Sequence, residues 1–192
     1  IIFFICFFSI CASNIENYIY TSLPSNKMFM PNANCIYKEK RQYVWIGTSD
    51  GIYRFDGAEY KRYEISVNGV FRSCTVKAIF VDKNNDLWFV SNMGVGKYYR
   101  NIDKFFVVPV LCEKRSGIDF NCYSIEEDGI YFGVSNGILK YDYETNQINL
   151  FHEFSLDSPF YVKYIKKIDE NKILVSDQYE ILLLDYEKGE YT

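Results

Sequence analysis

A single motif recurs along this chain at a constant interval, and this period restricts the fold more than any other feature. Four aligned positions lie 43 residues apart and hold Trp45, Trp88, Tyr131 and Leu174. The position six residues later is a glycine in the first three copies and Glu180 in the fourth. A repeat of about 40 to 45 residues is the length of one blade of a β-propeller.

Each copy is predicted to form four short antiparallel strands separated by polar turns. The second strand of each copy is expected at residues 44–48, 87–91, 130–134 and 173–177. The glycine after it opens the third strand, because a residue without a Cβ adopts positive φ at little cost. The sequence therefore predicts an all-β protein of four four-stranded antiparallel repeats, at residues 31–66, 74–110, 119–154 and 161–192. We expect an incomplete arc of a larger β-propeller, because the last copy ends without a strand that could close a ring.

Large aromatic residues occupy equivalent positions in successive copies. A single four-stranded sheet cannot cover both of its apolar faces, so neighbouring blades must bury them against one another. Flat side chains suit this packing better than they suit isolated surface positions. We therefore predict a role in the inter-blade core, rather than in sugar stacking, for Trp45, Trp88, Tyr131, Phe55, Tyr98 and Tyr141.

The first 13 residues predict an export signal whose start is clipped. Residues 1–11 are an almost unbroken apolar run, and Ala12 and Ser13 supply small residues for cleavage. This run is shorter than the about 20 residues that span a bilayer, and it fits no strand of a blade. Residues 14–30 then form a leading segment, and the remainder is expected to lie in the periplasm.

Four cysteines remain beyond this leader, and none has the Cys-x-x-Cys spacing of a metal site. Cys35 and Cys74 stand at the beginnings of inner strands and are predicted to be buried thiols. Cys112 and Cys122 flank the connection into the third copy and could meet. The sequence leaves open whether they form a disulfide.

Charge and motifs argue against several classes of function. The 25 acidic and 21 basic residues give a net charge of −4, and the cations are scattered, whereas nucleic-acid binding needs a basic patch. The one histidine, His152, is expected on an exposed rim without a catalytic motif. The acidic run Glu126-Glu127-Asp128 is read as a solvated turn. We therefore expect no catalytic residue, no metal and no cofactor.

The form Trp-Ile-Gly-Thr-Ser-Asp-Gly-Ile-Tyr-Arg-Phe-Asp-Gly at residues 45–57 resembles the two-component regulator propeller repeat, and residues 82–91 repeat the likeness. The resemblance covers roughly residues 31–192 and is weakest in the fourth copy, where Glu180 replaces the glycine. It implies the periplasmic sensor part of a hybrid two-component histidine kinase of Bacteroidetes, many of which respond to oligosaccharides. It also implies further blades, a membrane anchor in the inner membrane and downstream signalling domains as partners.

A ligand site in such a fold is expected where the loops entering the inner strands share a face with the turns after the second strands. Arg72 is a bidentate donor and stands with Ser73 before an inner strand. Turn-forming tendencies explain the Asn and Asp residues in the turns equally well. The candidate ligand-binding residues are Asn34, Arg72, Asn121, Asp50, Asn92 and Asn136.

Three classes of function stay open on the sequence alone. The favoured one is a sensor that binds an oligosaccharide or another small ligand without acting on it. The alternatives are an exported propeller enzyme, such as a polysaccharide lyase, and a scaffold for protein-protein interaction. A homodimer is a further expectation for the sensor.

Overall fold

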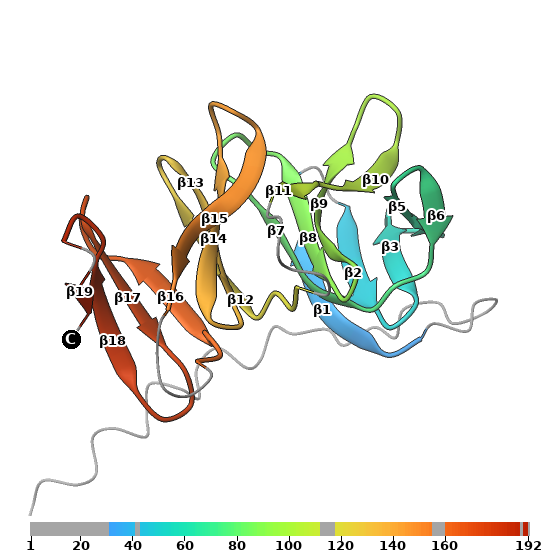
Figure 1. Ribbon diagram of the computed structural model, residues 1–192. Helices are drawn as coiled ribbons and strands as arrows, with labels where there is room; N and C mark the ends of the chain where they lie inside the picture. The colour runs from blue at the N-terminus through green and yellow to red at the C-terminus, as the bar shows by residue number, and fades with distance from the viewer. Residues whose placement is uncertain (1–30, 41–42, 112–117, 155–159, 189, 192) are drawn as a thin grey trace, which may run out of the picture. The chain divides into compact units, whose positions relative to one another are not determined.

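The structure is a computed structural model that describes residues 31–40, 43–111, 118–154, 160–188 and 190–191 (Figure 1). The chain divides into two units, residues 1–30 and 31–192, and every described residue belongs to the second. The predicted signal peptide, the leading segment 14–30 and Cys112 lie outside the described residues. Within the described part, no helix has the length and apolar character needed to cross a membrane.

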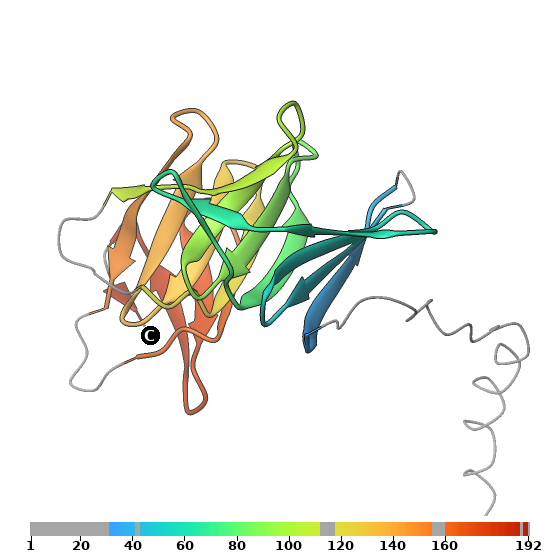
Figure 2. The same ribbon diagram turned by 90° about the vertical axis from the view of Figure 1, so that its right-hand side faces the viewer.

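The described residues form four mainly antiparallel sheets that follow one another in chain order (Figure 1 and, turned by 90°, Figure 2). The first sheet contains β1 (Ala33–Lys38), β2 (Val44–Thr48), β3 (Gly51–Phe55) and β4 (Tyr60–Tyr63). The fourth contains β16 (Tyr164–Lys167), β17 (Lys172–Ser176), β18 (Ile181–Asp185) and β19 (Glu190–Tyr191). The all-β class and the propeller-like repetition of sheets are as predicted.

The second and third sheets have more than the four strands that we expected. The second has the order β6-β5-β10-β9-β8-β7, and the third has the order β11-β15-β14-β13-β12. Their repeated strands are β7 (Val76–Val81), β8 (Leu87–Ser91), β9 (Gly94–Tyr99), β10 (Lys104–Val107), β12 (Cys122–Glu126), β13 (Gly129–Val134), β14 (Gly137–Asp142) and β15 (Gln147–Glu153). The additional ones are β5 (Ile65–Val67), β6 (Val70–Arg72) and β11 (Val110–Leu111).

The additional strands belong to the connections between sheets. β5 follows the last strand of the first sheet and pairs in parallel with β10 of the second. β11 follows β10 and pairs in parallel with β15 of the third sheet. Each connection thus forms backbone hydrogen bonds with the outer edge of the next sheet. The repeat pattern alone does not indicate this pairing.

Three apolar clusters fill the interfaces between successive sheets. Trp45 and Trp88 are fully buried, and Tyr131 is nearly so. Each tryptophan meets the next copy's aromatic residue: the ring centroids of Trp45 and Tyr98 lie 4.9 Å apart, and those of Trp88 and Tyr141 lie 4.6 Å apart. Such edge-on pairs add about 0.5 to 1.5 kcal/mol beyond burial. The predicted inter-blade core role is confirmed for five of the six aromatics. The exception is Phe55, which is buried but stacks on Tyr60 of its own sheet and belongs to none of the three clusters.

A buried carboxylate accompanies each tryptophan. Glu39 Oε2 accepts a hydrogen bond from Trp45 Nε1 at 3.0 Å, and Asp82 Oδ2 accepts one from Trp88 Nε1 at 2.8 Å. In both copies the acid stands six residues before the ring. An indole N–H without access to water needs such an acceptor, so this spacing is a packing requirement.

A cation stands opposite the anchor residue on the neighbouring strand in each of the first three copies. Lys97 pairs in register with Trp88, and its Nζ lies 4.7 Å from the centre of the indole ring. A cation over an aromatic face is attracted by the ring quadrupole. The three cations in this place are Arg54, Lys97 and Lys140.

The fourth copy replaces acid, ring and cation together, whereas the third replaces the acid and keeps an aromatic ring and a cation. In the fourth copy the three places hold Ile168, Leu174 and Leu183, and Leu174 pairs with Leu183. An aliphatic anchor has no N–H to satisfy and no ring face to attract a cation. In the third copy the acid's place is also apolar, and the Tyr131 hydroxyl donates to Asp128 instead, at 2.7 Å.

The turn after the second strand is left-handed in each of the first three copies, but not always at the predicted residue. Gly51 and Gly94 have φ of 106° and 127°. In the third copy the left-handed residue is Asn136, with φ of 56°, which directly precedes Gly137. Asparagine tolerates this region better than other residues with a side chain.

Candidate functional site

The face predicted to carry the site does bring turns and loops together. The Gly51 amide donates to the Cys74 carbonyl at 2.8 Å, and the Asn136 amide donates to the Phe160 carbonyl at 2.7 Å. Each bond joins the turn after a second strand to the loop that enters the next sheet's inner strand. This end of the sheets therefore gathers polar backbone and side chains from neighbouring sheets.

The predicted turn residues are occupied in holding these turns and loops. Asn92 Oδ1 accepts the Thr75 amide at 3.0 Å, and Asn136 Oδ1 accepts the Phe160 amide at 2.6 Å. The Asp50 carboxylate pairs with Arg62 at 3.0 Å. These contacts give Asp50, Asn92 and Asn136 a structural role, and their predicted ligand contacts stay predictions.

Two of the residues predicted before the inner strands, Asn34 and Arg72, lie elsewhere in the sheets. Asn34 is within β1, and its Nδ2 donates to the Val76 carbonyl of the second sheet at 3.0 Å. Arg72 is the last residue of β6, in the hairpin at the outer edge of the second sheet, and not in the loop before β7. The guanidinium that hydrogen-bonds Ser73 belongs instead to Arg62 of β4. Only the register of β4 beside β3 places Arg62 there.

A cavity of about 440 Å³ lies at this face between the third and fourth sheets. Its lining combines two phenol rings with amides, carboxylates and one ammonium group, from Asp119, Asn121, Tyr161, Lys163, Asp177, Gln178 and Tyr179. Of the six predicted site residues, Asn121 is the one in this lining. Tyr179 stands five residues after the anchor Leu174, as Asp50 does after Trp45, so the 43-residue period could have indicated this turn.

The parts of this cavity are held by local hydrogen bonds. Asp177 Oδ1 accepts the amides of Tyr179 and Glu180 at 2.7 and 2.9 Å, which shapes the turn before β18. The Tyr161 ring is 51% exposed and is available for contact. Asp119 forms an ion pair with Lys77 of the second sheet. An aromatic surface beside convergent polar groups suits a hydroxylated ligand.

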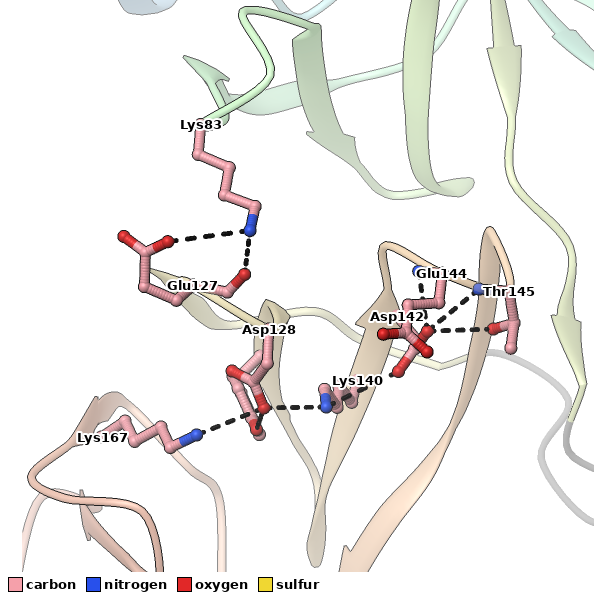
Figure 3. Close-up of polar contacts among 9 residues, drawn as sticks. Lys83, Glu127, Asp128, Lys140, Asp142, Glu144, Thr145 and Lys167 are labelled. Atoms are coloured by element: carbon pink, nitrogen blue, oxygen red, sulfur yellow. Dashed lines mark hydrogen bonds and ion pairs between the residues drawn. The ribbon is translucent and has the colours of Figure 1, made fainter.

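The acidic run at residues 126–128 ends in an exposed hairpin turn, as expected, and its carboxylates also link neighbouring sheets. Asp128 Oδ2 lies 2.9 Å from Lys140 Nζ and 3.2 Å from Lys167 Nζ, the latter from the fourth sheet (Figure 3). Burial opposes ionisation, but these hydrogen bonds and that from Tyr131 outweigh it and lower the pKa of Asp128 well below its ordinary value. Glu127 reaches Lys83 of the second sheet at 3.7 Å (Figure 3).

His152 lies in β15 and is half-buried, whereas we expected an exposed rim position. Its ring packs against Phe154 with the centroids 4.8 Å apart. Burial lowers the pKa of His152. Its Nε2 is buried without a hydrogen-bond partner among the described residues.

The described cysteines Cys35, Cys74 and Cys122 are free thiols. Burial raises the pKa of Cys74 and of Cys122 to about 11, so neither is a reactive thiolate at neutral pH. No group of three or more His, Cys, Asp or Glu residues suited to a metal ion occurs among the described residues.

Known structures share this arrangement of sheets. The extracellular domain of the hybrid two-component system BT3049 from B. thetaiotaomicron superposes with a TM-score of 0.67 at 16% identity, over 86% of this chain and 25% of that one. The chain shares its fold with that domain. The corresponding domain of BT4673 from the same organism gives a TM-score of 0.63 at 16% identity, over 78% of this chain and 20% of that one.

A structure with a bound peptide shows that this fold is not restricted to such systems. YCF48 bound to D1 peptide matches with a TM-score of 0.50 at 11% identity, over 80% of this chain and 50% of that one. No protein-family model matches the sequence, and no curated protein does either. The chain spans at most a quarter of the two extracellular domains.

Proposed function

We propose that this chain is part of the exported, ligand-sensing region of a hybrid two-component signalling protein, and that it binds an oligosaccharide without acting on it. The cavity between the third and fourth sheets carries this proposal, because the exposed Tyr161 and Tyr179 rings flank amide and carboxylate groups. Sugar rings present an apolar face and hydroxyl groups, which match such a lining.

The shared fold supports the same proposal. Two structures with these sheets are extracellular domains of hybrid two-component systems. The resemblance of residues 45–57 and 82–91 to their kind of repeat agrees with that. Fold alone does not set function, so binding must be measured. A sensor also needs a ligand that prefers one signalling state, and the kinase, the membrane anchor and the further blades remain parts of the proposal.

The binding test is calorimetry of the 192-residue chain with xylo-, manno- and cello-oligosaccharides of defined length. We expect one of these classes of oligosaccharide to bind. Tyr161→Ala should weaken the affinity for it about tenfold, as for other aromatic contact residues. The control is Tyr164→Ala, because Tyr164 is similarly exposed at 52% and does not line the cavity. Equal losses in both variants, or products of cleavage seen by chromatography, would refute the proposal.

A protein-interaction scaffold is the second candidate, and one observation favours it. Large apolar side chains of the fourth sheet are exposed, with Ile168 at 56% and Ile181 at 68%. Exposed large apolar side chains are a feature of protein contact surfaces. Sedimentation of the chain and of Ile181→Lys distinguishes the candidates, since a scaffold or homodimer built on this face would lose its self-association in the variant.

A further inference from the structure

A carboxylate fills the outer part of the first interface between sheets. Asp103, in the turn after β9, accepts hydrogen bonds from the Tyr63 hydroxyl at 2.8 Å, from the Tyr98 hydroxyl and from Lys61. Arg54 Nη1 lies 3.7 Å from the same carboxylate. Burial opposes its ionisation, yet these donors lower the pKa of Asp103 to about 2. This interface therefore contains an anion that hydroxyl and cationic donors surround.

The next interface repeats two of these donors but not the carboxylate. Asn146 stands 43 residues after Asp103, and the two have φ of 56° and 54°. The Tyr141 hydroxyl donates to Asn146 Oδ1 at 2.7 Å, as the equivalent Tyr98 does to Asp103. Lys97 stands 43 residues after Arg54 and is its equivalent at the second interface. A neutral amide thus replaces the anion beside a retained cation.

The second interface also has a smaller side chain at the position that Tyr63 holds in the first. Tyr63 pairs with Ile52 on the edge of the first sheet and packs on the Trp45 ring, with centroids 5.5 Å apart. The equivalent edge position is Val108, whose amide donates to the Val95 carbonyl at 2.9 Å. Valine lacks the phenol ring, and the space that it leaves is not refilled.

A cavity of about 590 Å³ lies at this place between the second and third sheets. Val108, Tyr141 and Asn146 line it, with Lys97, Arg100 and Asp86 as its charged residues. The Lys97 side chain is only 13% exposed, and its Nζ lies 2.9 Å from Asp86. Arg100 is held by Glu39 at 2.7 Å. The lining therefore carries two cations and one carboxylate.

We propose that this cavity binds a small hydroxylated carboxylate, such as a sugar acid, whose negative charge replaces, beside Lys97, the charge that the Asn146 amide lacks and that Asp103 supplies at the preceding interface. Lys97 and the side-chain N–H groups of Asn146 would receive the anion, since the Tyr141 hydroxyl already donates to Asn146 Oδ1. The amide of Asn101 and the phenol of Tyr99 supply partners for hydroxyl groups. This site is separate from the cavity at residues 119–121 and 161–163, so it stands or falls independently of the sensor proposal.

The test is titration of the 192-residue chain with D-glucuronate, and with D-glucose as the neutral match, by calorimetry and saturation-transfer NMR. We expect glucuronate to bind at least about tenfold more tightly than glucose, because only the acid can share Lys97 with its present partner Asp86. Asn146→Asp returns the protein's own carboxylate, and Val108→Tyr refills the space. Each should reduce glucuronate affinity about tenfold or more.

The matched control is Asn68→Asp, because Asn68 also has positive φ, at 50°, and lies in the β5–β6 turn away from the cavity. Circular dichroism and urea midpoints establish that each variant is folded. Equal affinity for glucuronate and glucose, no binding of glucuronate, or unchanged affinity in Asn146→Asp would each overturn the proposal. Loss of affinity in a folded Asn146→Asp variant, with the control unaffected, supports it.

Discussion

The carboxylate of Asp82 should stabilise the second sheet chiefly through its hydrogen bond from the Trp88 indole. A double-mutant cycle can isolate the free energy of that bond. Asp82 Oδ2 accepts the indole N–H at 2.8 Å. Its Oδ1 accepts the amides of Asn84 and Asp86 at 2.9 Å each. Asp82 is 5% exposed and Trp88 is fully buried. In Asp82→Ala the indole N–H therefore loses its partner where water does not reach.

The magnitude follows from these contacts. A buried donor left without a partner costs about 1 to 3 kcal/mol, and a hydrogen bond to a charged group contributes about 1.5 to 3 kcal/mol. The amides of the turn lie near solvent and regain water, so they add little. We expect Asp82→Ala to lower the free energy of unfolding by about 2 to 4 kcal/mol. In the Trp88→Phe background no N–H remains, and the cost should fall by about 1.5 kcal/mol or more.

The assay is urea unfolding of four proteins: the parent, Asp82→Ala, Trp88→Phe and the double variant. Glu127→Ala is the control, because the Glu127 side chain is fully exposed, and such a change stays within about 0.5 kcal/mol. The coupling energy is the difference between the two costs of Asp82→Ala. If the two losses add to within about 0.5 kcal/mol, the indole bond is not what the carboxylate provides, and our explanation of the six-residue spacing is wrong.

Two further predictions concern the first interface. The pKa of Asp103 falls from its ordinary 3.8 to about 2 in the folded protein, so its contribution to stability is present above pH 3.8 and is lost as the pH falls towards about 2. The difference in urea midpoint between the parent and Asp103→Asn should therefore be larger at pH 7 than at the lower pH, and a constant difference would contradict this. Gly47→Ala should destabilise the protein by about 1 to 3 kcal/mol, because a Cβ there would lie 2.5 Å from Cys35 Sγ and 2.7 Å from Val76 Cγ1. Cys35→Ala, added to Gly47→Ala, should restore part of that loss in urea unfolding. The equivalent pair of the second sheet shows why, because there a small residue, Ala78, lies opposite the larger Val90. If no stability is restored, the contact with Val76 alone prevents a side chain at position 47.

The sequence by itself determined the repeating unit, because its signals are local. The 43-residue period, the turn glycines and the aromatic anchors specify where strands begin and end and which side chains must be buried. The spacing of acid and tryptophan is also local, since both lie on one hairpin. These features predicted the four sheets and the core role of Trp45 and Trp88.

What only the tertiary structure decided depends on contacts between copies. The parallel strands β5 and β11 form because connecting segments meet the edge of the next sheet, and Arg62 reaches Ser73 because of strand register. The cavity between the second and third sheets lies where that interface has Val108 in place of the Tyr63 ring. A period shows which residues are equivalent, but volume and charge at an interface are set by two copies together, and no local pattern contains both.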